Sequence, residues 1–356
     1  MNSSSCIYPE LIALLRQHIN CVLATVVSTQ GSTPQKAGCS ALIGSSGLLA
    51  GTVGGGITEL KVIQQSQLLL KTKQSALLSF ELYGEIIKGS ESICGGNMTI
   101  LLDASPELHL PVFNQLKGSL DRRQKGILQT LTDASDSGDV KIERHWVVDE
   151  DQNFDRRVKD IVTEMIYNAH TESIRTIYFD EKEVFTKGFA LLESILPTPS
   201  LIIAGAGHIG QSLATLGKFL GFAVTVWDDR TEYADQTLIP DADVVLSGTF
   251  DKSLGQKPVQ ADSYLVIVTR GHKSDAEVLK KFIGSNAAYI GMIGSKAKVA
   301  QMKSSFLENG WANPEQWSRI HSPVGLNIGA QTVEEIAISI AAELVKVRSE
   351  KNKCDE

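Results

Sequence analysis

The chain has 356 residues, a formal net charge of -7 at pH 7 and an ordinary globular composition, with 42% hydrophobic and 21% charged residues. This length predicts two domains, and the acidic balance argues against nucleic acid or an anionic membrane surface as partner. The first residues lack the layout of a signal peptide, and no uncharged apolar run is long enough to span a membrane.

The cysteines are scattered along the chain and contain no C-x-x-C pair. They are Cys6, Cys21, Cys39, Cys94 and Cys354. This spacing argues against a disulfide framework and a structural zinc site. It also lacks the cysteine spacing of iron–sulfur proteins. We therefore expect a cytoplasmic protein whose thiols stay reduced.

The first half of the chain predicts a mixed α/β domain of undetermined topology. Amphipathic helices are expected at 9–19 and 57–73, separated by a strand at 21–29 and a glycine-rich stretch that contains "GSTPQKAG" and "GTVGGG". Further along, the patterns predict strands at 76–82 and 98–103, a helix near 112–123, and hairpins within 126–149 and 175–188.

The prolines of "ILPTPS", residues 195–200, mark the expected boundary, so we assign the domains to residues 1–196 and 197–356. After them, strand-like runs alternate with helical segments, which predicts a doubly wound parallel sheet of the Rossmann type. The last helix is expected to begin after an N-capping Thr332. The strand-like runs lie at 200–205, 223–229, 243–248, 263–269, 287–294 and 319–324.

The C-terminal domain carries a G-x-G-x-x-G motif, formed by Gly205, Gly207 and Gly210 between a strand and a helix. Glycine there permits a tight turn, close approach of a phosphate and tight helix–strand packing. Asp228 and Asp229 end the second strand, where an acid that binds ribose would lie. Arg230 leaves the choice between NAD and NADP open, and an ordinary solvated strand end is the alternative for both acids.

Three histidines, His208, His272 and His321, follow predicted strands at the carboxyl edge of the sheet. His208 and His272 are expected to face each other across the binding crevice, because their strands are neighbours in this fold. The alternative is that each histidine caps a helix. Ser295 and Lys296, in "IGSKAK", form a second candidate anion loop or an ordinary connection.

In the N-terminal half, Cys94 is followed by Gly95 and Gly96 in "ICGGN". Two explanations fit this stretch: a buried small residue before a turn, or a thiol held beside a ligand that approaches bare main chain.

The motifs together resemble one family. "GSTPQKAG", "GTVGGGITE" and "ICGGN" are similar to the N-terminal half of the xanthine dehydrogenase accessory factor (XdhC/CoxI) family. "AGAGHIG", "VWDDR", "TRGHKSDAEVL" and "YIGMIGSKAK" are similar to its C-terminal Rossmann domain. The resemblance implies a cytoplasmic accessory protein that binds the molybdenum cofactor (molybdopterin), protects it during sulfuration and assists its insertion into a molybdenum hydroxylase such as xanthine dehydrogenase. It also implies a homodimer, with a cysteine desulfurase as a further partner.

On this resemblance the cofactor is a soft, anionic ligand, and Cys94 either contacts molybdenum or relays sulfur. The expected cofactor-binding residues combine bare main chain, one acid and the Rossmann loops. They are Gly51, Gly54, Gly55, Gly56, Glu59, Cys94, Gly95, Gly96, Gly205, Gly207, His208, Gly210, Asp228, His272, Ser295 and Lys296.

Two other functions fit the Rossmann half alone: an NAD(P)-dependent oxidoreductase, and a regulator that senses a nucleotide. The chain has no Y-x-x-x-K proton relay, and a dehydrogenase does not need the N-terminal glycine loops or Cys94. We therefore expect a cofactor carrier, with NAD(P) as a second candidate ligand.

Overall fold

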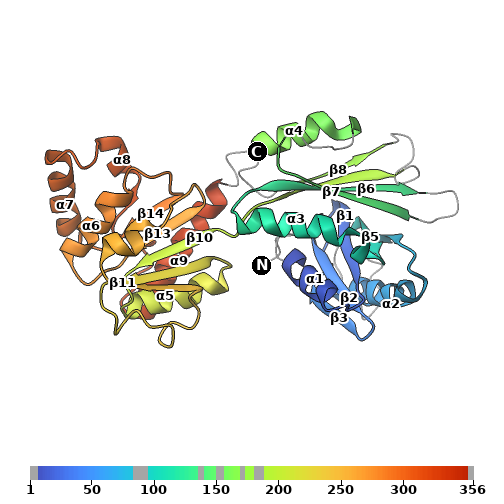
Figure 1. The fold of residues 1–356 in the computed structure, drawn as a ribbon, viewed down its shortest axis with the longest axis horizontal. Coiled ribbons are helices and arrows are strands. Elements are labelled where there is room, and N and C mark those ends of the chain that lie inside the picture. The colour runs from blue at the N-terminus through green and yellow to red at the C-terminus, as the bar shows by residue number, and fades with distance from the viewer. Residues whose placement is uncertain are drawn as a thin grey trace. The chain divides into compact units, whose positions relative to one another are not determined.

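The computed structural model describes residues 7–82, 95–134, 140–149, 156–168, 173–179 and 188–351. The chain forms two compact units that divide between Pro197 and Thr198 (Figure 1). Cys94 lies outside the described residues, as do Cys6 and Cys354.

A five-stranded antiparallel sheet with the order β3-β2-β1-β5-β4 opens the N-terminal unit. Helix α1 (Ile7–Arg16) packs on one face of this sheet and helix α2 (Gly56–Thr72) on the other, because neighbouring strand residues point to opposite faces. The strands are β1 (Val22–Gly31), β2 (Ser40–Gly44), β3 (Gly47–Gly51), β4 (Ala76–Glu81) and β5 (Gly96–Asp103).

The hairpin of β2 and β3 was missing from the sequence interpretation, which assigned residues 31–56 to a glycine-rich stretch. Each of these strands has only five residues, and glycine stands at both ends of β3. Short strands with glycine give a weak alternation signal, so only pairing with β1 identifies them.

A second antiparallel sheet, with the order β7-β6-β9-β8, completes this unit. The hairpin of β6 and β7 confirms the prediction for 126–149. The hairpin predicted within 175–188 was wrong in extent, since β8 pairs with residues after 188. The elements are η2 (Pro106–His109), α3 (Leu110–Asp121), β6 (Gly126–Ala134), β7 (Val140–Val147), η3 (Arg156–Val158), α4 (Lys159–Asn168), β8 (Ile174–Tyr178) and β9 (Phe189–Ile195).

The two sheets of the N-terminal unit share a core. Val27 and Leu101 of the first sheet pack against Phe189 and Leu191 of the second. The hydroxyl of Thr176 also donates to the Val27 carbonyl at 2.5 Å. The second sheet therefore supports β1 and β5, the strands that lead into the candidate site.

The C-terminal unit is a six-stranded parallel sheet with the order β12-β11-β10-β13-β14-β15, which confirms the predicted Rossmann architecture. All six predicted strands are present. They are β10 (Ser200–Ala204), β11 (Ala223–Asp228), β12 (Val244–Ser247), β13 (Ser263–Ile267), β14 (Tyr289–Met292) and β15 (Ile320–His321).

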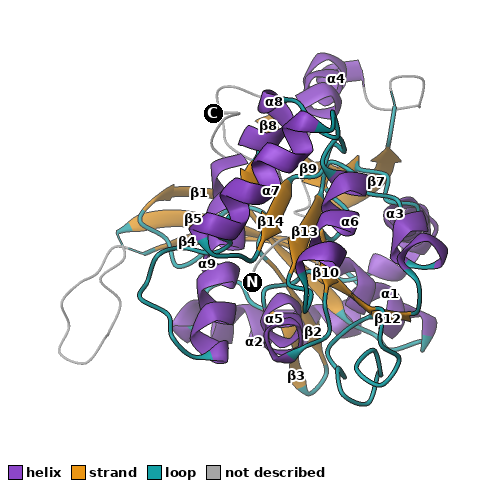
Figure 2. Ribbon diagram, turned by 90° about the vertical axis from the view of Figure 1, so that its left-hand side faces the viewer, coloured by secondary structure: helices purple, strands orange, loops and turns teal. Residues whose placement is uncertain are grey.

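Helices cover both faces of this sheet, and separate hydrophobic clusters lie on the two sides. Figure 2 shows α6 and α7 beside β13 and β14.

Thr332 caps α9 as predicted, because its hydroxyl accepts from the Glu335 N–H at 3.2 Å. The helices are α5 (His208–Phe219), η4 (Phe250–Lys252), η5 (Leu254–Gln256), α6 (His272–Phe282), α7 (Lys296–Glu308), α8 (Pro314–Ser318) and α9 (Val333–Lys351).

In the described part of the chain, no helix is both long enough and apolar enough to cross a membrane.

Candidate functional site

Three glycine-rich segments meet at one end of the five-stranded sheet. Gly31, which ends β1, is the register partner of Gly96, which begins β5. Gly54, between β3 and α2, approaches Pro34 so closely that a Cβ on Gly54 would lie 2.8 Å from the proline Cγ. We call this cluster the glycine cradle; it comprises residues 31–38, 51–56 and 95–96.

Part of the cradle needs glycine for packing alone. A Cβ at Gly96 would collide with the Gln30 carbonyl and lie 2.9 Å from the Ser32 carbonyl oxygen. The Ser32 N–H in turn donates to the Gly95 carbonyl at 3.3 Å. Close approach of two backbones therefore explains Gly96 without any ligand.

Other glycines in the cradle face open space. Gly55 and Gly56 have φ values of 69° and 57°, and a Cβ on either of them, or on Gly95, would meet nothing within 4 Å. Gly55 is the N-cap of α2 and offers no side chain to cap the helix. The first N–H groups of α2 have no partner within the helix, and the helix dipole favours an anion at that end.

Glu59 fixes the shape of the loop before α2. One oxygen of its carboxylate accepts from the Thr52 hydroxyl at 2.6 Å and from the Val53 N–H at 3.1 Å. The Gly54 N–H donates to the Thr52 hydroxyl at 3.2 Å. The described contacts thus give Glu59 a positioning role, since it holds the main chain that a ligand would meet.

The thiols differ in their surroundings. Cys39 is buried, and its thiol donates to the Gln35 side-chain oxygen at 3.1 Å. Burial raises the pKa of this thiol, while a hydrogen bond from the Lys36 main chain and the positive charge of Lys36 act in the opposite direction. Burial raises the pKa of Cys21 to about 11 within the hydrophobic core. Both are therefore protonated thiols at neutral pH. The prediction that Cys94 contacts the cofactor falls on a residue outside the described ones.

In the C-terminal unit, the glycine motif forms the expected turn between β10 and α5. A Cβ at Gly205 would collide with the Val268 carbonyl, and one at Gly210 with the Gly205 carbonyl. Gly207 is different, because a Cβ there would meet nothing within 4 Å, and it caps α5 without a side-chain hydrogen bond. Gly205 and Gly210 therefore serve packing, and Gly207 leaves main chain open to a ligand.

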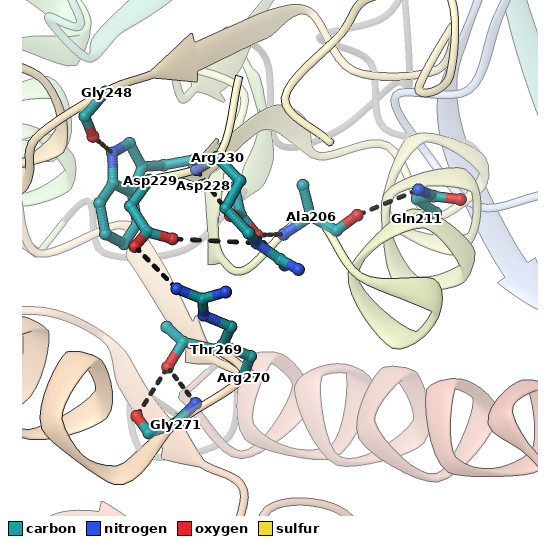
Figure 3. A network of polar contacts seen from close by, with 10 residues as sticks. Ala206, Gln211, Asp228, Asp229, Arg230, Gly248, Thr269, Arg270 and Gly271 are labelled. Carbon is teal, nitrogen blue, oxygen red and sulfur yellow. Dashed lines mark hydrogen bonds and ion pairs between the residues drawn. The ribbon is translucent and has the colours of Figure 1, made fainter. Parts of the chain in front are cut away.

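Asp228 ends β11 as predicted, but both oxygens of its carboxylate already have partners (Figure 3). Oδ2 accepts from the Ala206 N–H at 2.8 Å, and Arg230 forms a bidentate pair with both oxygens at 2.9 Å. Burial opposes ionisation, but these hydrogen bonds keep the pKa of Asp228 lowered. Asp228 thus connects the glycine turn to β11. A ribose hydroxyl that binds this carboxylate would have to compete with Arg230.

The exposed acid at this edge is Asp229. Its oxygens lie 3.9 Å from the guanidinium groups of Arg230 and Arg270, and 43% of its side chain is exposed (Figure 3). Arg230 also stacks over the Tyr233 ring, 3.8 Å from its centroid. Sequence spacing did not separate the roles of the two adjacent acids, because only the contacts of Arg230 distinguish them.

His208 and His272 occupy equivalent positions, as the first residues of α5 and α6 after the neighbouring strands β10 and β13. Both side chains are exposed. Gly271, the N-cap of α6, offers no side-chain cap, just as Gly207 offers none to α5. The carboxyl edge of the sheet thus presents two uncapped helix N-termini with a histidine at each.

Ser295 and Lys296 begin α7. The Ser295 side chain caps this helix by accepting from the Lys298 N–H at 3.4 Å, and both Ser295 and Lys296 are exposed. Ser295 therefore has an ordinary structural role as a helix cap. Lys296 stays a predicted ligand contact.

His321 has partners that the sequence did not indicate. Its Nδ1 lies 3.1 Å from Glu343, whose other oxygen accepts from the Gly325 N–H at 2.8 Å and from the Tyr289 hydroxyl. Burial opposes ionisation of Glu343, but these bonds lower its pKa. Glu343 lies on α9, 22 residues beyond His321, so no local spacing identifies the pair.

The glycine cradle suits a group such as the molybdenum cofactor in one respect that the contacts establish. The open main chain at Gly55, Gly56 and Gly95 and the uncapped α2 N-terminus provide donors for an anionic, oxygen-rich group. Within the described ranges, no cluster of His, Cys, Asp and Glu suits a bare metal ion. The cradle thus offers main-chain donors to an anionic ligand.

Two family models match the chain in the predicted order. The XdhC and CoxI family model matches residues 14–81, and the XdhC Rossmann domain model matches residues 201–344. The first match contains the loops before β2 and after β3, and the second contains all of the parallel sheet except Ser200, the first residue of β10.

Similar proteins agree with these matches. A protein of Bacillus subtilis (strain 168), named as a probable subunit of xanthine dehydrogenase, is 27% identical over 344 residues, which cover 95% of this chain and 96% of that protein. The "uncharacterized protein YqeB" of Escherichia coli (strain K12) is 24% identical over 96% of this chain, but the chain spans only 46% of YqeB.

A crystal structure of a protein described as a xanthine dehydrogenase from Bacillus halodurans superposes with a TM-score of 0.76 at 26% identity, and the match covers 98% of both chains. The likeness thus extends over both units and over the residues between the two matched models. The chain belongs to the XdhC/CoxI family, with an XdhC/CoxI segment in its N-terminal half and an XdhC Rossmann domain in its C-terminal half.

Proposed function

We propose that this protein is an accessory factor for a xanthine dehydrogenase-type molybdenum hydroxylase, and that it binds the molybdenum cofactor and assists its insertion. The observation that carries the proposal is the glycine cradle, which has open main chain at Gly55, Gly56 and Gly95, the last of which directly follows Cys94 in the sequence. The relatives named for xanthine dehydrogenase, from Bacillus subtilis and Bacillus halodurans, point to the client.

An accessory role suits this chain better than catalysis of the hydroxylase reaction. Its five cysteines are scattered and lack the spacing that binds iron–sulfur clusters. Cys21 and Cys39 are buried and protonated at neutral pH because burial raises the pKa of each. The word dehydrogenase in the relatives' names therefore describes, in our proposal, the enzyme that the protein serves.

Each part of the cradle has a role in this proposal. The bound cofactor supplies a molybdenum atom and an anionic pterin with a phosphate. The N–H groups at the start of α2 bind its anionic oxygens, and Glu59 holds the 52–54 loop in the shape that exposes them. Cys94 supplies a soft sulfur ligand for molybdenum. A cysteine desulfurase is the partner class that would deliver sulfur to the bound cofactor.

Retention of the cofactor by thiol variants tests this assignment. We expect the purified protein to retain isolated molybdenum cofactor under anaerobic conditions, and Cys94→Ala to weaken retention by about 10-fold or more, since one soft metal contact is lost. Cys39→Ala is the matched control, because it removes a thiol that directly follows the 31–38 segment of the cradle and is buried and paired with Gln35. Equal retention by wild type and Cys94→Ala would remove the thiol from the mechanism.

The Rossmann unit supports a second candidate function, the binding of a nucleotide such as NAD(P). The specific observation is the open main chain at Gly207 at the head of α5, in a sheet of Rossmann strand order. Competition distinguishes the two functions. NAD and NADP should leave cofactor retention unchanged if the cradle holds the cofactor, whereas strong dinucleotide binding without cofactor retention would favour an oxidoreductase or a nucleotide sensor.

A further inference from the structure

The end of strand β11 decides which kind of ribose the C-terminal unit can bind. In Rossmann folds, a carboxylate at the end of the second strand accepts hydrogen bonds from a ribose diol, whereas an arginine there binds a 2′-phosphate. This chain places both kinds of residue together, as Asp228, Asp229 and Arg230. The choice between NAD and NADP therefore depends on which of these side chains is free to bind a ligand.

Arg230 is committed to its neighbour Asp228. Its Nε and Nη2 donate to the two carboxylate oxygens of Asp228 at 2.9 Å, and its main-chain N–H donates to Asp228 Oδ1 at 3.0 Å. Its guanidinium also lies over the Tyr233 ring, and only 19% of the Arg230 side chain is exposed. A 2′-phosphate would therefore meet a guanidinium whose charge is already balanced by a carboxylate.

Asp229 is free to accept hydrogen bonds. Figure 3 shows its carboxylate between the guanidinium groups of Arg230 and Arg270. The nearest nitrogen of each guanidinium is 3.9 Å away, which is beyond hydrogen-bond distance, and 43% of the Asp229 side chain is exposed. The Asp229 oxygens can thus accept from the two adjacent hydroxyls of a ribose without losing a hydrogen bond within the protein.

Hydrogen bonds hold the end of β11 against the glycine turn. The Gly205 N–H donates to a β11 carbonyl at 2.7 Å, and the Ala206 N–H donates to the Asp228 carboxylate at 2.8 Å. Asp229 is the next residue, so it extends from the strand end that is bonded to the turn. The open main chain at Gly207 belongs to the same turn and can bind a phosphate of the same ligand.

We infer that the C-terminal unit binds a nucleotide whose ribose carries a free 2′,3′-diol, such as NAD or ADP, and that Asp229 accepts from this diol. The inference rests on the second candidate function, nucleotide binding. It excludes NADP as the preferred ligand, because a 2′-phosphate would bring a dianion against the negative charges of Asp229 and Asp228. Sequence spacing fits either acid as the ribose ligand, and the contacts of Arg230 assign this role to Asp229.

Arg270 gives the diphosphate of this ligand a positive charge. It follows β13, whereas Asp229 follows β11, and β10 lies between these two strands. The guanidinium therefore reaches across the end of β10, which leads into the glycine turn (Figure 3). When a diol occupies Asp229, this exposed guanidinium can pair with the phosphates instead.

Calorimetric titration of the full chain with NAD, NADP and ADP tests the preference. NAD and NADP differ only in the 2′-phosphate, and we expect NAD to bind more tightly by about 10-fold or more. ADP carries the same diol, so its affinity shows whether the adenosine half of NAD suffices. NADP binding as tight as NAD binding would overturn the inference and leave nucleotide binding standing, whereas no binding of any of the three would overturn both.

Asp229→Asn tests the assignment of the ribose ligand. We expect the affinity for NAD to fall by about 10-fold and the affinity for NADP to rise, because the variant loses one strong acceptor and one repulsive charge. Glu308→Gln is the matched control, since it removes an equal charge from the exposed last residue of α7. An unchanged preference for NAD in Asp229→Asn, or an equal change in Glu308→Gln, would contradict the role of Asp229.

Arg270→Gln separates binding of the diphosphate from binding of the ribose. We expect NAD and ADP to bind about 5-fold more weakly, while the preference for NAD over NADP persists. The Arg270 side chain is 63% exposed and lies 3.9 Å from its nearest acid, so the variant should fold like wild type, which circular dichroism checks. Unchanged affinity for both ligands would remove Arg270 from the site.

Discussion

Buried carboxyl groups show how single residues in this fold depend on their contacts. Glu193 on β9 is 2% exposed and accepts from the Tyr8 hydroxyl of α1 at 2.8 Å. Burial raises its pKa to about 7, against the opposing effects of the Tyr8 hydrogen bond and the Arg144 charge. Asp103, on β5, has the buried Arg144 as its own partner. The N-terminal unit thus holds two buried carboxyl groups of different kinds. Asp103 is paired with a positive charge, whereas the raised pKa of Glu193 favours its protonated form.

Glu193 makes stability depend on pH. Its ordinary pKa is 4.5 and its pKa in the folded chain is about 7, so the folded state binds the proton more tightly. The associated stability is present below pH 4.5 and is lost as pH rises through 7. We expect Glu193→Gln, measured by chemical denaturation, to gain roughly 3 kcal/mol of unfolding free energy relative to wild type between about pH 5 and about pH 8. Glu10→Gln, an exposed control on α1, should show no such trend; an unchanged difference for Glu193→Gln would refute the raised pKa.

Asp228 and Asp229 form a matched pair for testing the network in Figure 3. Asp228→Asn removes a charge that pairs with Arg230 and accepts from the Ala206 N–H. We expect it to lower the unfolding free energy by roughly 2–4 kcal/mol, because a largely buried pair is broken. Asp229→Asn should change stability by less than about 0.5 kcal/mol, since Asp229 is partly exposed and makes only long contacts. Equal effects in denaturant titrations would contradict the division of roles.

At the scale of elements, the Rossmann half was largely predictable and the N-terminal half was not. Parallel strands buried on both faces appear in the sequence as continuous apolar runs, and each run here became a strand. The antiparallel order β3-β2-β1-β5-β4 pairs β1 with a strand some 70 residues later. Such long-range pairing leaves no local signal, which is also why the hairpin of β2 and β3 was missed.

The same distinction holds for the candidate site. The sequence indicated its glycine loops, because glycine marks turns and close approaches. It did not indicate that Gly54 meets Pro34 or that Gly31 pairs with Gly96, since both contacts depend on the sheet. The ion pair of Asp228 with Arg230 and the pairing of His321 with Glu343 could also be identified only from the tertiary structure.

The helix that follows β10 allows the ligand role of glycine to be separated from its packing role. Gly207→Ala adds a Cβ in open space, whereas Gly210→Ala drives a Cβ into the Gly205 carbonyl. We expect Gly207→Ala to change the thermal midpoint little and Gly210→Ala to lower it by several degrees. In calorimetric titration with NADP, any binding by wild type should weaken in Gly207→Ala. A destabilised Gly207→Ala would show that this glycine too serves packing.

At the scale of the whole molecule, the accessory role makes a prediction about the client. In cells that produce this chain, its deletion should leave the xanthine dehydrogenase-type hydroxylase at normal abundance but depleted of molybdenum, because folding and cofactor insertion are separate steps. Metal analysis of the purified hydroxylase measures this effect. Restoration by wild type, but not by Cys94→Ala, would link the deficit to the proposed thiol. A hydroxylase with full molybdenum content in the deletion strain would contradict the role.

The proposed ligand of this protein is the molybdenum cofactor, and chemical analysis of the purified protein shows whether the protein carries it. The full chain, purified under anaerobic conditions from cells that make the cofactor, is analysed for molybdenum and, after denaturation, for released pterin. We expect molybdenum and pterin in equal amounts, both reduced in Cys94→Ala and unchanged in Cys39→Ala. A protein that contains neither, and instead carries a bound dinucleotide, would contradict this expectation.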